Sequence, residues 1–106
     1  MSQMIVPKYK VLMCYDINQA THEQYYQFVI GDFVPSLQKL GLYMLQVYHT
    51  AYGNYPVRQL EFVAEDMETI RKAFASDTWK RLEKKFKGYT TNYSQKIVRF
   101  RDAFQL

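Results

Sequence analysis

The sequence predicts an α+β domain whose strands and helices follow one another in the order βαββαβ. Short runs rich in β-branched and aromatic residues alternate with longer runs whose apolar residues recur at helical spacing. The 106 residues, 48% of them hydrophobic, suffice for one buried core and are too few for two. We therefore treat residues 1–106 as a single domain.

The first strand is expected at residues 9–17, where every odd position is apolar or aromatic. A capping box, Thr21-His22-Glu23-Gln24, then predicts the start of the first helix. One helical face should pack on the sheet through Tyr26, Ile30, Phe33, Leu37 and Leu40. Pro35 interrupts this pattern, so we expect a kink or a brief break near residues 31–34.

Gly41 is expected to close this helix with a positive φ and to lead directly into strand two, residues 42–52. Gly53-Asn54 predicts a two-residue hairpin turn before strand three, residues 57–64. Asp66 can cap a second helix, and Ser76-Asp77 predicts a break with a fresh cap. The second helical region is therefore expected to be split.

Gly88 is expected to end that region, and residues 94–101 should form strand four. The resulting order is the ferredoxin-like pattern, in which right-handed crossovers place both helices on one face of a four-stranded antiparallel sheet. The other face would stay uncovered while carrying much apolar surface, which predicts a covering partner. The expected contacts on that face are Leu12, Met44, Gln46, Tyr48, Val63 and Ile97.

The chain resembles the dimeric α/β-barrel superfamily, which includes NIPSNAP-like, EthD-like and antibiotic-biosynthesis-monooxygenase-like proteins. The resemblance lies in residues 35–41 (PSLQKLG) leading into strand two, in the long stripe of helix one, and in the split second helix with Trp79 opening its later half. It implies a homodimer whose sheets face one another and close into a barrel. It also implies a small organic molecule between helices and sheet. Some members of the group are cofactor-independent oxygenases, isomerases or decarboxylases, others bind haem, and many have no known activity.

Composition narrows the other possibilities. The formal charge is +4, with basic residues concentrated after Arg71, which suits either a solvated helix face or an anionic partner. Cys14 is the only cysteine, and neither the histidines nor the carboxylates show close ligand spacing, so no metal or cofactor is expected. No run of about eighteen apolar residues and no signal sequence is found, so we expect a cytoplasmic protein without a membrane partner.

Aromatic residues make up 17% of the chain and supply most candidates for a binding site. Tyr15, Tyr25, Tyr26 and Trp79 could line a pocket for an aromatic or quinone-like molecule, or they could simply form the core. His49, at the far end of strand two, could act as a general base together with Tyr15, or could be structural. His22, in the first helical turn, is a further candidate for substrate binding and could equally be solvent-exposed.

Three functional interpretations remain open. The first is a barrel enzyme or small-molecule binder, and the second is a dimerisation module without chemistry. The third is an RNA-recognition-type domain, because residues 58–63 (RQLEFV) partly match the strand-three signature of that fold. That signature wants small residues where Gln59 and Glu61 stand, and Glu61 would repel phosphate, so nucleic-acid binding is the least favoured interpretation.

Overall fold

The computed structural model describes residues 6–49 and 58–100 of the chain, and of residues 46–49 it describes the backbone alone. The predicted Gly53-Asn54 turn lies outside these residues. Four strands form one antiparallel sheet in the order β2-β3-β1-β4. Their bounds are Tyr9–Ile17 (β1), Tyr43–His49 (β2), Arg58–Ala64 (β3) and Thr90–Arg99 (β4).

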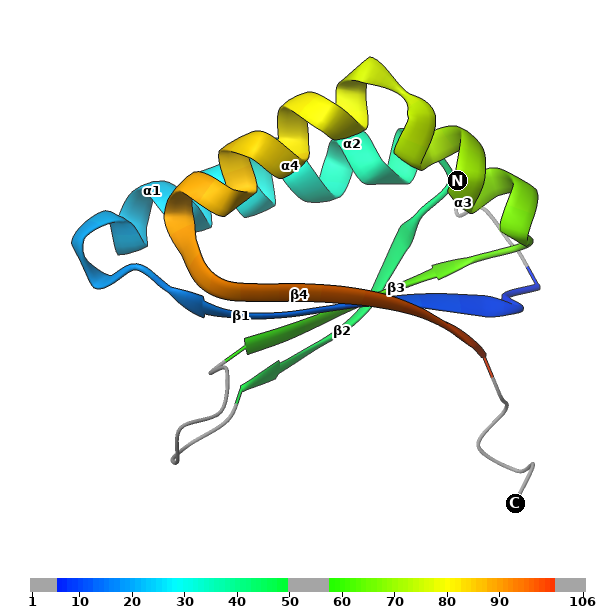
Figure 1. Ribbon diagram of the computed structural model, residues 1–106, viewed down its shortest axis with the longest axis horizontal. Coiled ribbons are helices and arrows are strands. Elements are labelled where there is room, and N and C mark those ends of the chain that lie inside the picture. The colour runs from blue at the N-terminus through cyan, green and yellow to red at the C-terminus, as the bar shows by residue number, and fades with distance from the viewer. Residues whose placement is uncertain (1–5, 50–57, 101–106) are drawn as a thin grey trace.

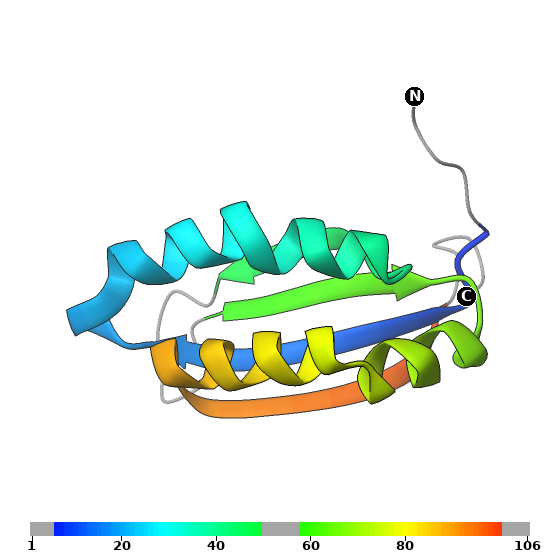
Figure 2. The same ribbon diagram turned by 90° about the horizontal axis from the view of Figure 1, so that it is seen from above.

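All helices lie on one face of the sheet, which confirms the predicted ferredoxin-like α+β fold (Figure 1). The first helical region contains η1 (Gln19–Thr21), α1 (His22–Phe28), the π-helix η2 (Val29–Phe33) and α2 (Val34–Lys39). The second is split, as predicted, into α3 (Met67–Ala75) and α4 (Asp77–Tyr89). Seen from above, α1 to α2 run over the β2–β3 side of the sheet, and α3 and α4 over the β1–β4 side (Figure 2).

Helix one contains a π-turn at the place where the sequence predicts a kink. The backbone N–H of Val34 donates to the Val29 carbonyl, five residues back, and Pro35 follows in the first turn of α2. The buried residues of this region are spaced by four: Tyr25, Val29, Phe33 and Leu37. A straight α-helix would turn Leu37 about 120° away from Tyr25 over that distance. The wider π-turn absorbs part of this drift and leaves Ile30 72% exposed, so its expected place on the core face is wrong.

The sheet contains two irregularities in its ladders. Tyr43 pairs with Val63 and Met44 with Phe62, but beyond a bulge at Leu45 it is Gln46 that pairs with Glu61. The register of β4 against β1 shifts between the partners of Cys14 and Asp16. At this shift Asn92 adopts a φ of 54°, and its side-chain amide donates to the Asp16 carboxylate at 2.7 Å. Each bulge changes which face the following residues occupy.

The helix ends follow the predicted capping in part. Asp66 and Ser76 accept hydrogen bonds from the backbone N–H groups of Thr69 and Trp79, as expected of N-caps. Thr21 makes no capping bond, and Asn18 instead caps the short η1 turn. Gly88 lies inside α4, which continues to Tyr89, so its predicted role as a terminator is wrong.

The core lies between the helices and the sheet. It contains Met13, Tyr15 and Phe62 from the central strands together with Phe33 and Phe86 from the two helical regions. The Phe33 and Phe86 rings stack with centroids 4.9 Å apart, so they join the two helical regions directly over the sheet. This core packs the first helical region against the central strands β1 and β3.

Candidate ligand pocket

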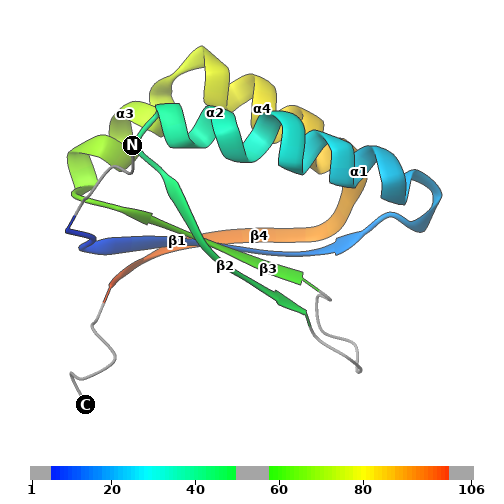
Figure 3. The same ribbon diagram turned by 180° about the vertical axis from the view of Figure 1, so that it is seen from behind.

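A cavity of about 340 Å³ opens between the first helical region and the β2–β3 edge of the sheet. Its walls come from α1, η2 and α2 on one side and from β2 and β3 on the other. Figure 3 shows the first helical region above the sheet, with β2 in front of the other strands. The lining residues are Tyr25, Tyr26, Val29, Ile30, Val34, Met44, Arg58 and Leu60. We call this set the helix–sheet pocket. Its volume lies in the usual range of small-molecule sites.

The π-turn and the β2 bulge together shape this pocket. The π-turn directs Ile30 toward the rim instead of the core, and Ile30 is 72% exposed. The register before the bulge places Met44 opposite Phe62, a core residue, so Met44 belongs to the helix side of the sheet. Irregular helix turns and bulges are over-represented at functional sites, and here both border the same cavity.

The polar end of the pocket consists of tyrosines and one arginine. The Tyr15 and Tyr25 hydroxyls hydrogen-bond to each other, and both residues are almost fully buried. Arg58 Nη2 donates to the Tyr26 hydroxyl, and the guanidinium also lies 5.0 Å from the centroid of the Tyr26 ring. Tyr25 and Tyr26 pack edge to face with their centroids 5.2 Å apart, which links the two pairs.

Burial sets the ionisation of this cluster. Desolvation is the main cause that raises the pKa of Tyr15 and of Tyr25 above the ordinary value, while the Arg58 charge lowers both to a smaller extent. The two phenols therefore stay protonated at neutral pH. Their hydroxyls are bonded to each other and buried, so the pocket presents the positive charge of Arg58 at one end and an apolar wall elsewhere.

Comparison with solved structures places this arrangement in a known fold. An EthD family protein of Bacillus halodurans superposes with a TM-score of 0.68 at 15% identity, covering 89% of this chain and 99% of that one. A NIPSNAP domain protein of Burkholderia xenovorans gives 0.66 at 9% identity, with 91% and 96% covered. The chain has the fold of the EthD and NIPSNAP proteins.

A third solved structure with the same fold carries a description that mentions a chemical activity. A Bacteroides thetaiotaomicron protein of unknown function, described as a possible oxidoreductase, gives a TM-score of 0.67 at 8% identity, covering 89% of this chain and 98% of that one. No family profile matches this sequence, and no curated protein matches it significantly. The resemblance predicted from the sequence is thus confirmed at the level of the fold.

In this EthD-like fold, some of the predicted site residues lie at the helix–sheet pocket and others lie away from it. Tyr25 and Tyr26 line the helix–sheet pocket, and Tyr15 lies behind Tyr25 as its hydrogen-bond partner. His22 is exposed and does not line the pocket, although its ring packs edge-on against Tyr26 at 4.8 Å. The backbone of His49 pairs with Arg58, which places that position beside the polar end of the pocket in register.

Trp79 does not line this pocket, which differs from the sequence prediction. It is buried near the junction of α3 and α4, where its ring stacks on Phe74 with the centroids 4.5 Å apart and lies 6.4 Å from Phe33. The Ser76 cap at that junction directs Trp79 into the core. Its environment is that of a structural residue.

Arg58 is the charged pocket residue that the sequence prediction missed. In the sequence, Arg58 belongs to the run of residues 58–63 that partly matches an RNA-binding signature. Nothing in that run indicates that the Arg58 side chain lies beside tyrosines. The signal that could have found it is register: in antiparallel pairing, Arg58 opposes Tyr15 and also His49, two residues already regarded as candidates. Val29, Val34, Met44 and Leu60 were likewise not predicted as lining residues.

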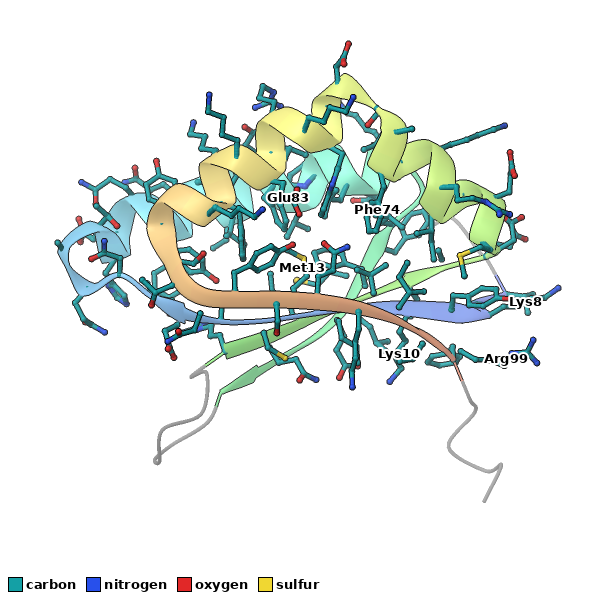
Figure 4. The ribbon with its side chains drawn as sticks, in the orientation of Figure 1. Lys8, Lys10, Met13, Phe74, Glu83 and Arg99 are labelled. Atoms are coloured by element: carbon teal, nitrogen blue, oxygen red, sulfur yellow. The ribbon has the colours of Figure 1, made fainter. Side chains whose placement is uncertain are left out.

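The open face of the sheet carries a polar network at its centre. Lys10 Nζ lies 3.1 Å from Glu61 Oε1, Gln59 donates to the other oxygen of Glu61 at 2.9 Å, and Cys14 donates to Gln59 at 3.1 Å. Figure 4 shows Lys10 on the side of the sheet away from the helices and Met13 on the helix side. The open face is therefore more polar at its centre than the predicted alternation suggests.

Two of the predicted interface residues lie on the other face. Met44 pairs with Phe62 and Ile97 with Val11, and both partners are core residues beneath the helices. Leu12 and Val63 do share the open face with Glu61, and the register sets Gln46 and Tyr48 opposite Glu61 and Gln59. In β4 it is Val98, opposite Lys10, that belongs to this face.

The described residues contain neither a metal-ligand cluster nor a membrane-spanning helix. Within residues 6–49 and 58–100, no group of three or more His, Cys, Asp or Glu side chains could hold a metal ion. In the same part of the chain, no helix is long and apolar enough to cross a membrane.

Proposed function

We propose that this chain binds a small aromatic or quinone-like organic molecule in the helix–sheet pocket. The observation that carries the proposal is the cavity of about 340 Å³, walled by Val29, Val34 and Leu60 and closed at one end by phenols and Arg58. An apolar wall with a few convergent polar groups is the usual composition of a ligand site. The fold shared with EthD and NIPSNAP proteins is consistent with this use.

The test is binding of a panel of phenols, quinones and naphthalene derivatives, followed by calorimetry or NMR. Val34→Phe should narrow the pocket and weaken any hit at least about tenfold, because a larger ring occupies the space of the ligand. Ile97→Phe is the matched control, because Ile97 is partly exposed and does not line the pocket. Equal affinities for both variants and the parent chain would refute the site.

The proposal extends to proton-transfer chemistry on the bound ring, of the cofactor-independent oxygenase or isomerase type. His49 is the candidate base, and its backbone pairs with Arg58. The Arg58 charge would stabilise the oxyanion left when a proton is removed. His49→Gln and Tyr15→Phe should each lower turnover of any converted panel compound at least about tenfold while the fold is retained. Unchanged turnover in both variants would remove these residues from the mechanism.

A dimerisation module is the second candidate function. The observation that favours it is the sheet face that no described helix covers (Figures 1 and 3). Leu12 and Val98 lie partly exposed on that face beside the Lys10–Glu61 pair, whereas Val63 on the same face is only 7% exposed. A second copy of the sheet would cover Leu12 and Val98. RNA is a poorer partner, because the central strands present Leu12, Cys14, Gln59 and Glu61 there instead of aromatic rings on which bases could stack.

A further inference from the structure

Arg58 is the one charged residue among those that line the helix–sheet pocket. Among the described residues no carboxylate lies within 4.0 Å of its guanidinium, whereas Arg81, Arg71 and Lys10 each have such a partner. The adjoining residues 50–57 (TAYGNYPV) contain no Asp or Glu. The positive charge of Arg58 is therefore balanced neither by the described residues nor by the composition of the neighbouring segment.

The hydrogen bonding of this guanidinium is also incomplete. Nη2 donates to the Tyr26 hydroxyl, while Nε is shielded from solvent and has no partner in the described part of the chain. A buried donor without a partner is costly, and a buried charge without a counter-charge is more so. A guanidinium carries five N–H donors, and the two on Nη1 and the second one on Nη2 make no hydrogen bond to the described residues.

The rest of the pocket selects the body of the ligand. Val29, Val34, Met44 and Leu60 form an apolar wall, and the cavity of about 340 Å³ suits a molecule of one or two rings. The Tyr25 ring belongs to the same wall, with its hydroxyl already bonded to Tyr15. An apolar body with one acidic oxygen group would satisfy both ends of the pocket.

We propose that the ligand of this pocket is an organic anion: a one- or two-ring apolar molecule whose ionised oxygen group binds Arg58. The proposal rests on the proposed function, since it names the class of molecule bound at the same site. The oxygen group is a carboxylate or an acidic enol, and either would bind the N–H groups of Nη1 and Nη2 that Tyr26 leaves free. The overall charge of +4 also favours the approach of an anion.

The experiment compares 2-naphthoate with 2-naphthamide, which has nearly the same shape and no charge, by calorimetry at pH 7. The expected result is a preference for the anion of about tenfold or more, the usual worth of a charge-assisted hydrogen bond. Arg58→Met should abolish that preference while changing the affinity for the amide by less than about threefold. A third probe, 2-hydroxy-1,4-naphthoquinone, shows whether an acidic enol is preferred over the carboxylate.

Arg71→Met is the matched control, since it removes the same charge from an exposed site on α3 outside the pocket lining. Equal binding of acid and amide to the parent chain would overturn the inference and leave the proposed function standing. A preference that survives Arg58→Met would overturn it as well. Failure of all three probes to bind would overturn the proposed function together with the inference. The comparison on the parent chain holds even if the Arg58 variant does not fold.

Discussion

The buried Tyr15–Tyr25 pair is the feature at the residue scale with the clearest energetic consequence. Each hydroxyl is the partner of the other within the core. Replacing one by Phe leaves the remaining hydroxyl buried without a partner, whereas replacing both removes the polar groups together. We expect Tyr15→Phe to lower the free energy of unfolding by about 1–3 kcal/mol, and the double variant with Tyr25→Phe to lie closer to the parent chain. Urea unfolding measures this, and an additive double variant would contradict it.

The same pair predicts the response of stability to alkaline pH. The folded-state pKa values of Tyr15 and Tyr25 lie above the ordinary value of 10.0 because of burial. The native state therefore keeps protons that the unfolded chain releases. Their contribution to stability is complete below pH 10 and falls as the pH rises further. Urea unfolding between pH 8 and pH 11.5, a range that spans the ordinary tyrosine pKa of 10.0, should show the free energy of unfolding falling above that pKa. The fall should be shallower in the double Phe variant, and equal slopes would contradict the account.

Gly41 is the second residue with a specific requirement. Its φ is +93°, and a Cβ built there would lie 2.6 Å from Thr69 Cγ2. Gly41→Ala should therefore cost about 1–3 kcal/mol of unfolding free energy. Adding Thr69→Ser, which removes the Cγ2 methyl and keeps the hydroxyl bonded to Asp66, should recover the steric part of that cost. Gly88→Ala is the matched control, since nothing lies within 4 Å of its Cβ position and its φ is not positive. A Gly41 variant as stable as this control would refute the requirement.

At the scale of elements, the two helical regions are joined across their outer surface by Asp32 of η2 and Arg81 of α4. Arg81 Nη1 lies 2.9 Å from Asp32 Oδ2, and Ser36 donates to the same carboxylate at 2.9 Å. The hydrogen bond from Arg81 is the main cause that lowers the pKa of Asp32. The stability that ionised Asp32 contributes is therefore fully present above the ordinary pKa of 3.8. It is lost as the pH falls through the lower pKa of the folded state.

Asp32→Asn should consequently lower the free energy of unfolding at pH 7 by no more than about 1 kcal/mol, because Arg81 is half-exposed and water screens the pair. Urea unfolding of this variant at pH 7 and at pH 3 tests the account, and the difference from the parent chain should shrink at the lower pH. Glu68→Gln, on the exposed pairs of α3 with Arg71 and Lys72, is the control. A larger loss for the control than for Asp32→Asn would contradict a joining role.

The elements were predictable from sequence, and Pro35 predicted an interruption of the first helix, but the faces on which the irregularities place the neighbouring side chains were not predictable. Apolar periodicity gave the order of strands and helices, and the Ser76 cap gave the split of the second helix. The π-turn inserts an extra residue that moves Ile30 out of the core face, and the bulge at Leu45 moves Met44 to the helix side. Single-sequence alternation carries no signal for such insertions, because each neighbouring residue is also apolar. Ile97 and Val98 show the same ambiguity at an edge strand, where only the register against β1 decides the face.

At the scale of the whole molecule, the open sheet face makes the oligomeric state testable. We expect a homodimer at micromolar concentration by light scattering or native mass spectrometry. Leu12→Lys should shift it to monomer, because a second lysine beside Lys10 places uncompensated charge on the proposed interface. Ile97→Lys is the control on the helix side of the sheet and should remain dimeric. A clean monomer for the parent chain would contradict the dimer proposal without affecting the pocket.

The pocket itself is tested most directly by methyl NMR of the full chain titrated with 2-naphthoate. The account predicts shift changes at the Ile30, Met44 and Leu60 methyl groups, which line the helix–sheet pocket. The methyl groups of Leu12, Val63 and Leu82 should stay unchanged, since the first two lie on the open face and Leu82 lies in the core outside the pocket lining. Changes confined to Leu12 and Val63, or no changes at saturating ligand, would contradict the central claim.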